Sequence, residues 1–395
     1  MNVLSLSTIF PSAVAPAQGV FIKERLKGLM SRHDVEVWRC RPWSPGLGWF
    51  RKEARRPFPA KETVDGLLVR DLRFPYVPGA MKTWDGPSLA RSVLRALRGS
   101  HFRPDLLDAH FAYPAGYAAV RVAERLGIPS VITLRGTFPS YLADRRRGRI
   151  REALLGATRV VAVSQSLADE ARRLVGSDRD MDFDCRVVPN GIDTGLFQPG
   201  DATASAARLG LPRRRPVLLT VGGLVPRKGA HRVIRILPRL LDRHPDLLYV
   251  LVGGGSVEGD FRRELEASIR DLGLERSILI TGERPHEELP DFYRAADVFV
   301  LSTSNEGWAN VLQESLACGT PVVTTDVGGN RDVVGAEDHG LVVPFDDEDG
   351  LAAAILEALD RNWSRAAISK WGRRLDWGDV AVNVSAVFEE ALREF

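Results

Sequence analysis

The sequence predicts two α/β domains, each built around a doubly wound parallel sheet, and three observations lead to this fold class. Short apolar, β-branched segments alternate with amphipathic helical segments along the chain, as in strands joined by crossover helices. The alternation breaks into turn residues at 187–193 and restarts at Val217. With 395 residues, 44% of them hydrophobic, the chain is long enough for two sizeable cores.

The individual elements follow from the same pattern. In the first half we expect strands at residues 3–7, 35–38, 105–109, 130–134 and 159–163, with helices near 19–30 and 116–126 and from Ser166 onward. In the second half we expect strands at 217–221, 247–252, 278–281, 297–302 and 322–325, with helices near 230–241, 261–272 and 287–295. We therefore predict an N-terminal domain at 1–195, a linker at 196–215, a C-terminal domain at 216–370, and a final helix at 371–395 that crosses back.

The cysteine content, the first residues and the length of the apolar runs indicate the cell compartment. Cys40, Cys185 and Cys318 are too scattered for a disulfide framework or a zinc spacing, so we expect a reducing environment. The first residues lack the basic start and long apolar core of a signal peptide. No apolar run approaches the roughly 20 residues that span a bilayer. We expect a cytoplasmic protein, soluble or peripheral on the inner face of the cell membrane.

The net charge of +3 is unevenly divided. Residues 1–200 hold 31 Lys and Arg against 20 Asp and Glu, and the remainder hold 23 against 31. The basic half is expected to face an anionic partner. Nucleic acid is not expected, because no nucleic-acid-binding module is recognisable. Aromatic residues beside the basic stretch 51–56, Trp43 among them, suit an anionic membrane surface; an ordinary acceptor-side loop is the alternative.

Two glutamates, Glu306 and Glu314, form the most informative pattern in the chain. They lie eight positions apart, between the strand at 297–302 and a helix stop at 318–321. On a helix, this spacing returns Glu314 near the azimuth of Glu306, about 12 Å along the axis. Glu306 itself lies at the carboxyl end of a strand, where open α/β sheets bind ligands. We expect the pair to hold the two ends of one extended polar ligand.

A glycine turn with two cations, residues 222–229, follows a strand and opens a helix. Gly222 and Gly223 let the backbone approach a ligand, and the helix start favours phosphate oxygens. Arg227 and Lys228 add two positive charges that suit a diphosphate. A basic surface turn is the alternative.

Two further segments of the second half are donor-site candidates. Gly253 and Gly254 follow another strand and either admit a base or ribose or form a tight connection. Asn310 and Val311 lie in the first turn of the helix behind Glu306, where amides meet phosphate.

The first half contributes candidates at the carboxyl ends of its strands. Gly19, after the first strand, would let a phosphate approach. His110, followed by Tyr113, would donate to a sugar hydroxyl or orient an acceptor, although a lone His is more often structural. Arg135 closes the strand at 130–134 as a clamp for phosphate or carboxylate, or as a surface charge. The acidic run at 178–184 resembles a metal motif, but it lies apart from the other candidates and is interpreted as a solvated loop.

Together these motifs resemble the retaining family 4 glycosyltransferases of the GT-B fold, in which two Rossmann-like domains face each other across a cleft. The resemblance covers nearly the whole chain and is carried by residues 11–21, 110–119, 189–193, 222–229, 253–255, 306–314, 319–323 and 326–329. The first half is similar to the branch that synthesises bacterial surface polysaccharides.

The resemblance implies a nucleotide-diphosphate-sugar donor, UDP- or GDP-linked, bound by the second domain, and a saccharide or lipid-linked acceptor. By position, Glu314 would hold the ribose, Glu306 would lie by the sugar, and Arg227 and Lys228 would neutralise the leaving diphosphate. Gly19 would approach the diphosphate, and His110 would face the sugar and acceptor. It further implies retention of anomeric configuration, with no metal and no other cofactor.

Two positions depart from the family pattern. Family members commonly have Arg at the position of Gly223, which leaves Arg227 as its substitute, and often His at the position of Arg135. The second departure suggests an anionic acceptor or donor sugar. A GT-B nucleotide-sugar epimerase and a non-catalytic sugar-nucleotide-binding protein are the rival hypotheses.

Overall fold

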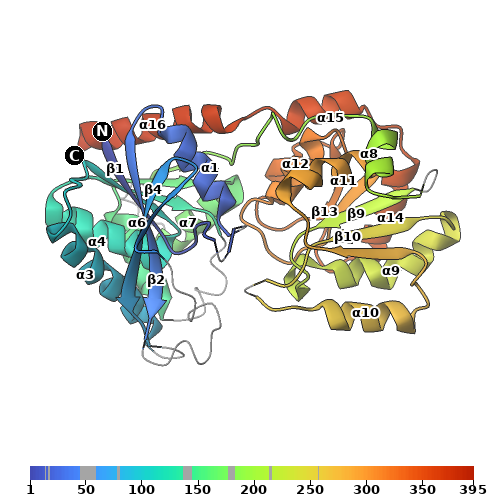
Figure 1. Ribbon diagram of the computed structural model, residues 1–395, viewed down its shortest axis with the longest axis horizontal. Helices are drawn as coiled ribbons and strands as arrows, with labels where there is room; N and C mark the ends of the chain where they lie inside the picture. Colours follow the sequence, from blue (N-terminus) through green and yellow to red (C-terminus); the bar gives the residue numbers. More distant parts are fainter. Residues whose placement is uncertain are drawn as a thin grey trace. The chain divides into compact units, whose positions relative to one another are not determined.

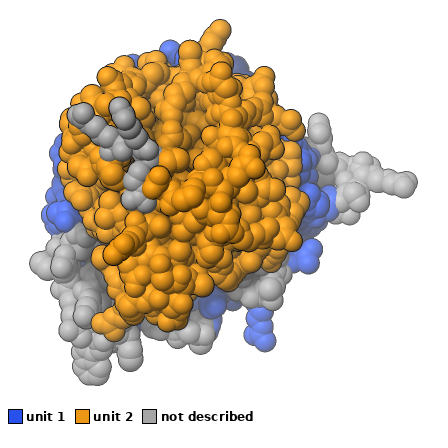
Figure 2. Space-filling view, turned by 90° about the vertical axis from the view of Figure 1, so that its right-hand side faces the viewer, with its two compact units in different colours: residues 1–191, 377–395 blue, residues 192–376 orange. Residues whose placement is uncertain are grey.

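The computed structural model describes residues 1–13, 15–16, 18–44, 59–77, 81–136, 145–176, 183–212, 216–256 and 258–395. The chain forms two compact units. Unit 1 comprises residues 1–191 and 377–395, and unit 2 comprises residues 192–376 (Figure 2).

Unit 1 contains one sheet in the order β3-β4-β2-β1-β5-β6-β7-β8. Its strands are β1 (Asn2–Ser7), β2 (Asp34–Trp43), β3 (Lys61–Val64), β4 (Leu67–Pro75), β5 (Leu106–His110), β6 (Ser130–Leu134), β7 (Arg159–Ala162) and β8 (Cys185–Val187). Its helices are α1 (Val20–Leu29), α3 (Asp85–Arg98), α4 (Tyr117–Leu126), α6 (Arg146–Gly156), α7 (Gln165–Val175) and α16 (Trp377–Glu394), with short helical turns Lys82–Trp84 and Ala112–Gly116. All described pairings are parallel except that of β3 with β4 at the edge.

Alternate residues of these strands build two cores, one on each face of the sheet. Val3, Val37 and Leu106 pack with α1 and α16, whereas Leu4, Trp38 and Leu107 pack with α3 and α4. The period of two is that of a strand buried on both faces. Helix α16 returns the chain to unit 1 and packs against α1 (Figure 1). The contact is close, because a Cβ on Gly28 would lie 2.8 Å from the carbonyl oxygen of Trp377.

Unit 2 contains a six-stranded parallel sheet in the order β11-β10-β9-β12-β13-β14. Its strands are β9 (Val217–Val221), β10 (Leu248–Val252), β11 (Ile278–Gly282), β12 (Val298–Leu301), β13 (Val322–Thr325) and β14 (Gly340–Val343). Its helices are α8 (Ala202–Arg208), α9 (Ala230–Arg243), α10 (Arg262–Asp271), α11 (Leu289–Ala295), α12 (Asn310–Ala317), α13 (Asn330–Val334), α14 (Glu348–Asp360) and α15 (Arg365–Gly372), with short helical turns Pro226–Lys228 and His286–Glu288. One face of the sheet is covered by α9, α10 and α14 (Figure 1).

The two sheets confirm the predicted fold class, two doubly wound parallel-sheet domains. In each sheet the chain winds outward in one direction, returns, and winds outward in the other. The reversal lies between β1 and β5 in unit 1 and between β9 and β12 in unit 2. The carboxyl ends of these strand pairs are where such sheets bind ligands.

The stretch proposed as a linker, 196–215, belongs to unit 2. Within it, Asp201 caps α8 by accepting from the amides of Thr203 and Ala204. Ser205 and Arg208 then donate to the carboxylate of Asp291 on α11 at 2.8 and 2.7 Å. The boundaries of the units are therefore Gly191 and Asp376.

Candidate functional site

The two glycine turns of unit 2 pack backbone against backbone at the carboxyl ends of β9 and β10. Gly222 and Gly253 adopt φ values of +147° and +145°. A Cβ on Gly253 would lie 1.9 Å from the carbonyl oxygen of Gly222. Hydrogen bonds from Gly222 N to Val252 O (2.9 Å) and from Leu224 N to Gly254 O (2.7 Å) fix the pair. Gly253 and Gly254 leave no room for a side chain, and the φ of Gly222 favours glycine. The two turns therefore bring backbone, without side chains, to the ligand-binding edge.

The loops after β9 and β12 are likewise joined. Gly229, with φ +81°, lies so close to Ser302 that a Cβ would meet its carbonyl oxygen at 1.9 Å. The amide of Ser304 donates to the carbonyl of Arg227 at 2.9 Å. On the other side, a Cβ on Gly328 would meet the carbonyl of Glu306 at 1.6 Å. Backbone contacts thus hold Glu306 at the mouth of the glycine turn.

Arg227 and Lys228 both donate to one oxygen of Glu306. The distances to Glu306 Oε1 are 3.1 Å from Arg227 Nη1 and 2.6 Å from Lys228 Nζ. The hydroxyl of Thr303 donates to the same oxygen at 3.2 Å. Two cations predicted to serve a diphosphate and the carboxylate predicted to lie by the sugar therefore meet at one point, still partly accessible to solvent.

A residue that sequence reasoning missed, Glu258, completes this cluster. Its carboxylate accepts from Arg227 Nη2 and Nε at 2.6 and 2.8 Å. The bidentate hydrogen bond raises the pKa of Arg227 and lowers that of Glu258. The Glu258 amide donates to Ser256 Oγ at 3.1 Å. Arg227 is thus clamped between two carboxylates, an arrangement that an incoming diphosphate would have to displace.

Glu314 is held from inside the unit. The phenol of Tyr293, itself fully buried, donates to Glu314 Oε2 at 2.7 Å. Burial first, and then the charge of Glu314, raises the pKa of Tyr293 well above its ordinary value, so the phenol stays protonated and donates. The other oxygen, Oε1, lies 3.8 Å from His286 Nε2. Glu314 is therefore oriented by one oxygen, which leaves Oε1 for a ligand hydroxyl.

Asn310 and Val311 are the first two residues of α12. This is the end of the helix whose dipole favours an anion. The structure thus places them where the sequence expected, between Glu306 and Glu314 along the same segment.

In unit 1, His110 and Arg135 meet each other rather than the surface. Arg135 Nε donates to His110 Nδ1 at 3.0 Å, and Arg135 Nη1 donates to Asn190 Oδ1 at 2.7 Å. His110 is fully buried, with Nε2 3.2 Å from Asp108 Oδ2. Burial lowers the pKa of His110 to about 4, so the imidazole is neutral. Neither ring nitrogen is presented to a sugar, which gives His110 a supporting position behind Arg135.

Gly19 and Tyr113, the other two candidates of unit 1, each make contacts within that unit. Gly19 caps α1 with φ +74°, and a Cβ would lie 3.0 Å from the carbonyl of Ile9, so the tight turn itself favours glycine. The hydroxyl of Tyr113 donates to Lys82 O and accepts from the Gly86 amide, both at 2.8 Å. Burial raises the pKa of this phenol to about 12. The Tyr113 hydroxyl is thus fully hydrogen-bonded inside unit 1 and is not positioned to bind the acceptor substrate.

Other expectations fall partly outside the described ranges. Most of the acidic run 178–184 and of the aromatic-basic stretch 43–56 lies there, although Trp43 is described and is 47% exposed. Within the described ranges, no three His, Cys, Asp or Glu side chains are placed to hold a metal ion. No helix in those ranges is both long and apolar enough to cross a bilayer.

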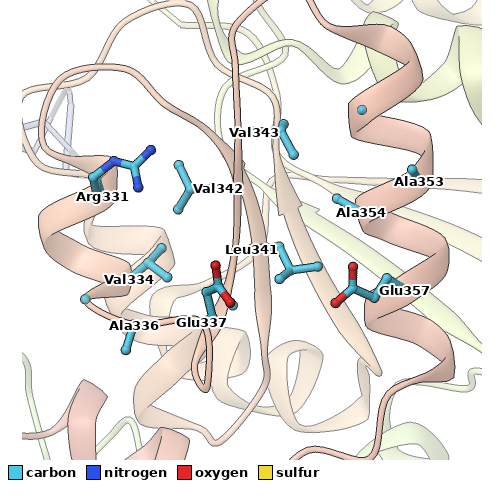
Figure 3. A pocket seen from close by; sticks show the side chains of 13 residues that line it. Arg331, Val334, Ala336, Glu337, Leu341, Val342, Val343, Ala353, Ala354 and Glu357 are labelled. Carbon is cyan, nitrogen blue, oxygen red and sulfur yellow. The ribbon is translucent and has the colours of Figure 1, made fainter.

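A pocket of about 390 Å³ in unit 2 carries none of the predicted residues (Figure 3). It lies at the edge strand β14, between α13 and α14, and is lined largely by small or apolar side chains with Glu337 and Glu357. Arg331, its cation, is paired with Asp326 at 2.5 Å. The cluster around Glu306, with converging cations and glycine turns at the topological reversal, is the better candidate site.

Comparison with protein families gives two adjoining matches. The model described as Glycosyltransferase Family 4 matches residues 18–196, and the model described as Glycosyl transferases group 1 matches residues 201–375. The two matches divide the chain close to the boundary between the units.

Two relatives are similar over most of the chain. The putative teichuronic acid biosynthesis glycosyltransferase TuaC of Bacillus subtilis is 32% identical over 373 residues, covering 91% of this chain and 89% of the relative. The D-inositol 3-phosphate glycosyltransferase of Acidothermus cellulolyticus is 33% identical over 400 residues, covering 95% and 86%.

Solved structures share the fold. Sucrose-phosphate synthase from Thermosynechococcus elongatus superposes with a TM-score of 0.81 at 21% identity, covering all of both chains. HepE of Anabaena, solved in complex with UDP, gives a TM-score of 0.74 at 19% identity, covering 99% of this chain and 100% of that chain.

Proposed function

This chain belongs to the family 4 glycosyltransferases of the GT-B fold, and we propose from that premise that it moves a sugar from a nucleotide-diphosphate-sugar to an acceptor hydroxyl. The observation that carries the proposal is the convergence of Arg227 and Lys228 on Glu306 Oε1 beside the glycine turns of unit 2. Two cations held this close at a ligand-binding edge suit a group with two negative phosphates.

Each donor part has a matching group in unit 2. The diphosphate binds to Arg227, Lys228 and the start of α12. The turns at Gly222 and Gly253 let the backbone approach it. Oε1 of Glu314, the oxygen that does not bind Tyr293, accepts from a ribose hydroxyl. Once the diphosphate draws off the two cations, Glu306 Oε1 is released to accept from a hydroxyl of the transferred sugar.

We propose that Arg227 and Lys228 stabilise the charge that develops on the departing diphosphate, so that transfer proceeds without a metal ion. Preorganised cations of this kind act where charge appears in the transition state. Retention of configuration is proposed on the family resemblance, with attack on the face of the leaving group. Glu306 then positions the donor and is not assigned as a nucleophile.

The name of one relative supports a role in making polysaccharides or glycolipids, since TuaC is named for teichuronic acid synthesis.

A structural neighbour bears on the nucleotide of the donor. HepE has been solved with UDP and with UDP-glucose, and we therefore propose a UDP-linked donor first and a GDP-linked donor second. A panel of nucleotide sugars in a thermal-shift screen tests the choice, since a tight donor raises the melting temperature by mass action.

Incubation with donor alone, and then with acceptors, tests the reaction class. Slow release of nucleoside diphosphate without acceptor, and a product with the anomeric configuration of the donor by NMR, are expected of the retaining transferase. Recovery of an epimerised nucleotide sugar would instead support an epimerase. Donor binding with no turnover over a broad acceptor panel would support a non-catalytic binding protein.

We also propose that unit 1 meets an anionic membrane surface. Trp43, at the end of β2, is 47% exposed, as expected of an interfacial aromatic anchor. Flotation with vesicles with and without anionic lipid tests this. Binding that does not depend on anionic lipid would remove the proposal.

A further inference from the structure

A buried group of charges in unit 1 does not balance. Arg25, Asp108, His110 and Arg135 lie within it, and each is at most 7% exposed. His110 is neutral because burial lowers its pKa to about 4. The cluster therefore holds two guanidinium groups and one carboxylate, that of Asp108, whose charge acts on both arginines. Asp108 accepts from Ser5 Oγ at 2.8 Å. The cluster keeps one positive charge in excess.

Among the described residues, the cluster has more unpartnered hydrogen-bond donors than acceptors. Arg135 donates through Nε to His110 and through Nη1 to Asn190, but no described residue accepts from its Nη2. Nε and Nη2 of Arg25 also have no acceptor there, against one unpartnered acceptor oxygen, Asp108 Oδ1. Buried unpaired donors and uncompensated charges are costly, and when a fold retains them they point to a ligand or a functional constraint.

The surroundings hold Arg135 in one orientation. His110 and Asn190 fix two of its nitrogens, and the ring of Phe21 on α1 lies 5.2 Å from its central carbon. Behind it, His110 accepts through Nδ1, which places the ring proton on Nε2, 3.2 Å from Asp108. Asp108, His110 and Arg135 thus lie in a row, and Nη2 is the nitrogen of Arg135 that neither His110 nor Asn190 holds.

Arg135 lies at the edge of the sheet where ligands are expected. Arg135 directly follows β6, and His110 ends β5, the strand at the reversal of the sheet. The carboxyl ends of these strands are where doubly wound sheets bind ligands. Because Nε and Nη1 are already occupied, Nη2 is the nitrogen left to a ligand, and a charged donor favours the oxygen of a carboxylate or phosphate over a neutral hydroxyl.

We propose that Arg135 is a specificity-determining residue that selects an acceptor carrying an oxyanion, the carboxylate of a uronic acid or the phosphate of a sugar phosphate. His110 and Asp108 act through it as positioning residues. The inference rests on the proposed glycosyl transfer, and it names the substrate class of that reaction.

The test compares acceptors that differ only in charge. One acceptor ends in a hexuronic acid, the second in its neutral methyl ester, and the third in a sugar phosphate. For the native chain, kcat/KM is expected to be about 10- to 100-fold higher for a charged acceptor than for the ester, the range of a charge-assisted hydrogen bond. The carboxylate and phosphate arms show which oxyanion is preferred.

Substitutions then locate the effect. Arg135→Gln should bring the ratio of charged to neutral acceptor close to one, and Arg135→Lys should restore part of it. Arg91→Gln on the exposed surface of α3 is the matched control and should keep the native ratio. Donor hydrolysis without acceptor is measured alongside, and only Arg91→Gln is required to keep the native rate. An unchanged ratio of charged to neutral acceptor in Arg135→Gln overturns the proposal.

A binding measurement separates this inference from the proposed reaction. D-glucuronate and inorganic phosphate are titrated while the melting temperature is followed, with the methyl ester of glucuronic acid as the neutral probe. A rise caused by an anion in the native chain but not in Arg135→Gln supports the site even if no donor is turned over. Equal responses in both proteins count against it.

Discussion

Replacing Glu258 by Gln is expected to tighten the binding of the donor diphosphate, because it removes a carboxylate that already occupies Arg227. Glu258 accepts from Nη2 and Nε of Arg227 at 2.6 and 2.8 Å. A phosphate oxygen needs the same nitrogens. The free energy of nucleotide binding therefore includes the separation of this pair, and the substitution removes that term.

The magnitude follows from the exposure of the pair. The side chains of Arg227 and Glu258 are 32% and 42% exposed, so solvent screens their attraction and the pair is worth about 0–1 kcal/mol. At 1.4 kcal/mol for each factor of ten, the upper end corresponds to about fivefold tighter binding. Since Glu306 still holds Arg227 Nη1 at 3.1 Å, the guanidinium should keep its place after the substitution.

Isothermal titration with UDP and GDP measures the effect in the native chain, Glu258→Gln and a control. Glu266→Gln is that control, because Glu266 accepts from Arg262 at 2.7 Å with 38% exposure but lies on α10. The gain should shrink as salt rises from low ionic strength to about 0.5 M. Weaker binding by Glu258→Gln would refute the reasoning, since it would mean that Glu258 positions Arg227 for the ligand.

The other predictions concern the rate, the ribose carboxylate and pH. Arg227→Ala should lower kcat for transfer about 100-fold, since it removes one preorganised donor to the developing charge; near-normal initial rates at saturating donor would contradict its assignment. Tyr293→Phe leaves Glu314 Oε2 without its buried donor and should lower the free energy of unfolding by about 1–3 kcal/mol; an unchanged urea midpoint would contradict this. The hydrogen bond from Arg208 lowers the pKa of Asp291, so this carboxylate stabilises the fold above its unfolded pKa of about 4 and stops doing so as pH falls through the lower folded value. Melting temperatures of the native chain and Asp291→Asn should differ at pH 7 and converge near pH 2, and a constant difference would refute the linkage.

Most strands of the two sheets could be predicted because their chemistry is local. Central strands of a parallel sheet are buried on both faces and form short apolar runs, as in β9 and β12. The hairpin of β3 and β4 was not predicted, since both strands lie at or near the edge and alternate between buried and exposed residues. The edge strands β8 and β14 were not predicted either. Helix α8 was taken for linker because its anchor, Asp291, lies far along the chain.

The residues of the candidate site were likewise predicted only in part. Arg227, Lys228 and Glu306 were predicted from loops at the ends of neighbouring strands, and the structure brings their charged groups within 3.1 Å. Glu258 carried no signal, because a single glutamate in a polar turn resembles any surface residue. The burial of His110 was equally hidden, since it depends on Arg135 and Asn190 from later segments.

The position of Gly223 shows how the charge of the donor site is arranged in this chain. A Cβ at Gly223 would lie 3.3 Å from the Cβ of Ser256, so the turn that carries Glu258 packs closely against this glycine. The cation comes instead from Arg227, whose guanidinium reaches both Glu258 and Glu306. An arginine restrained by two carboxylates is preorganised, but part of its charge is neutralised until a diphosphate displaces them. The donor site of unit 2 is therefore expected to bind the nucleotide more weakly than it would if Arg227 and Lys228 had no carboxylate partners. The positive charge of Arg227 is expected to act fully on the diphosphate only after the diphosphate has displaced Glu258 and Glu306.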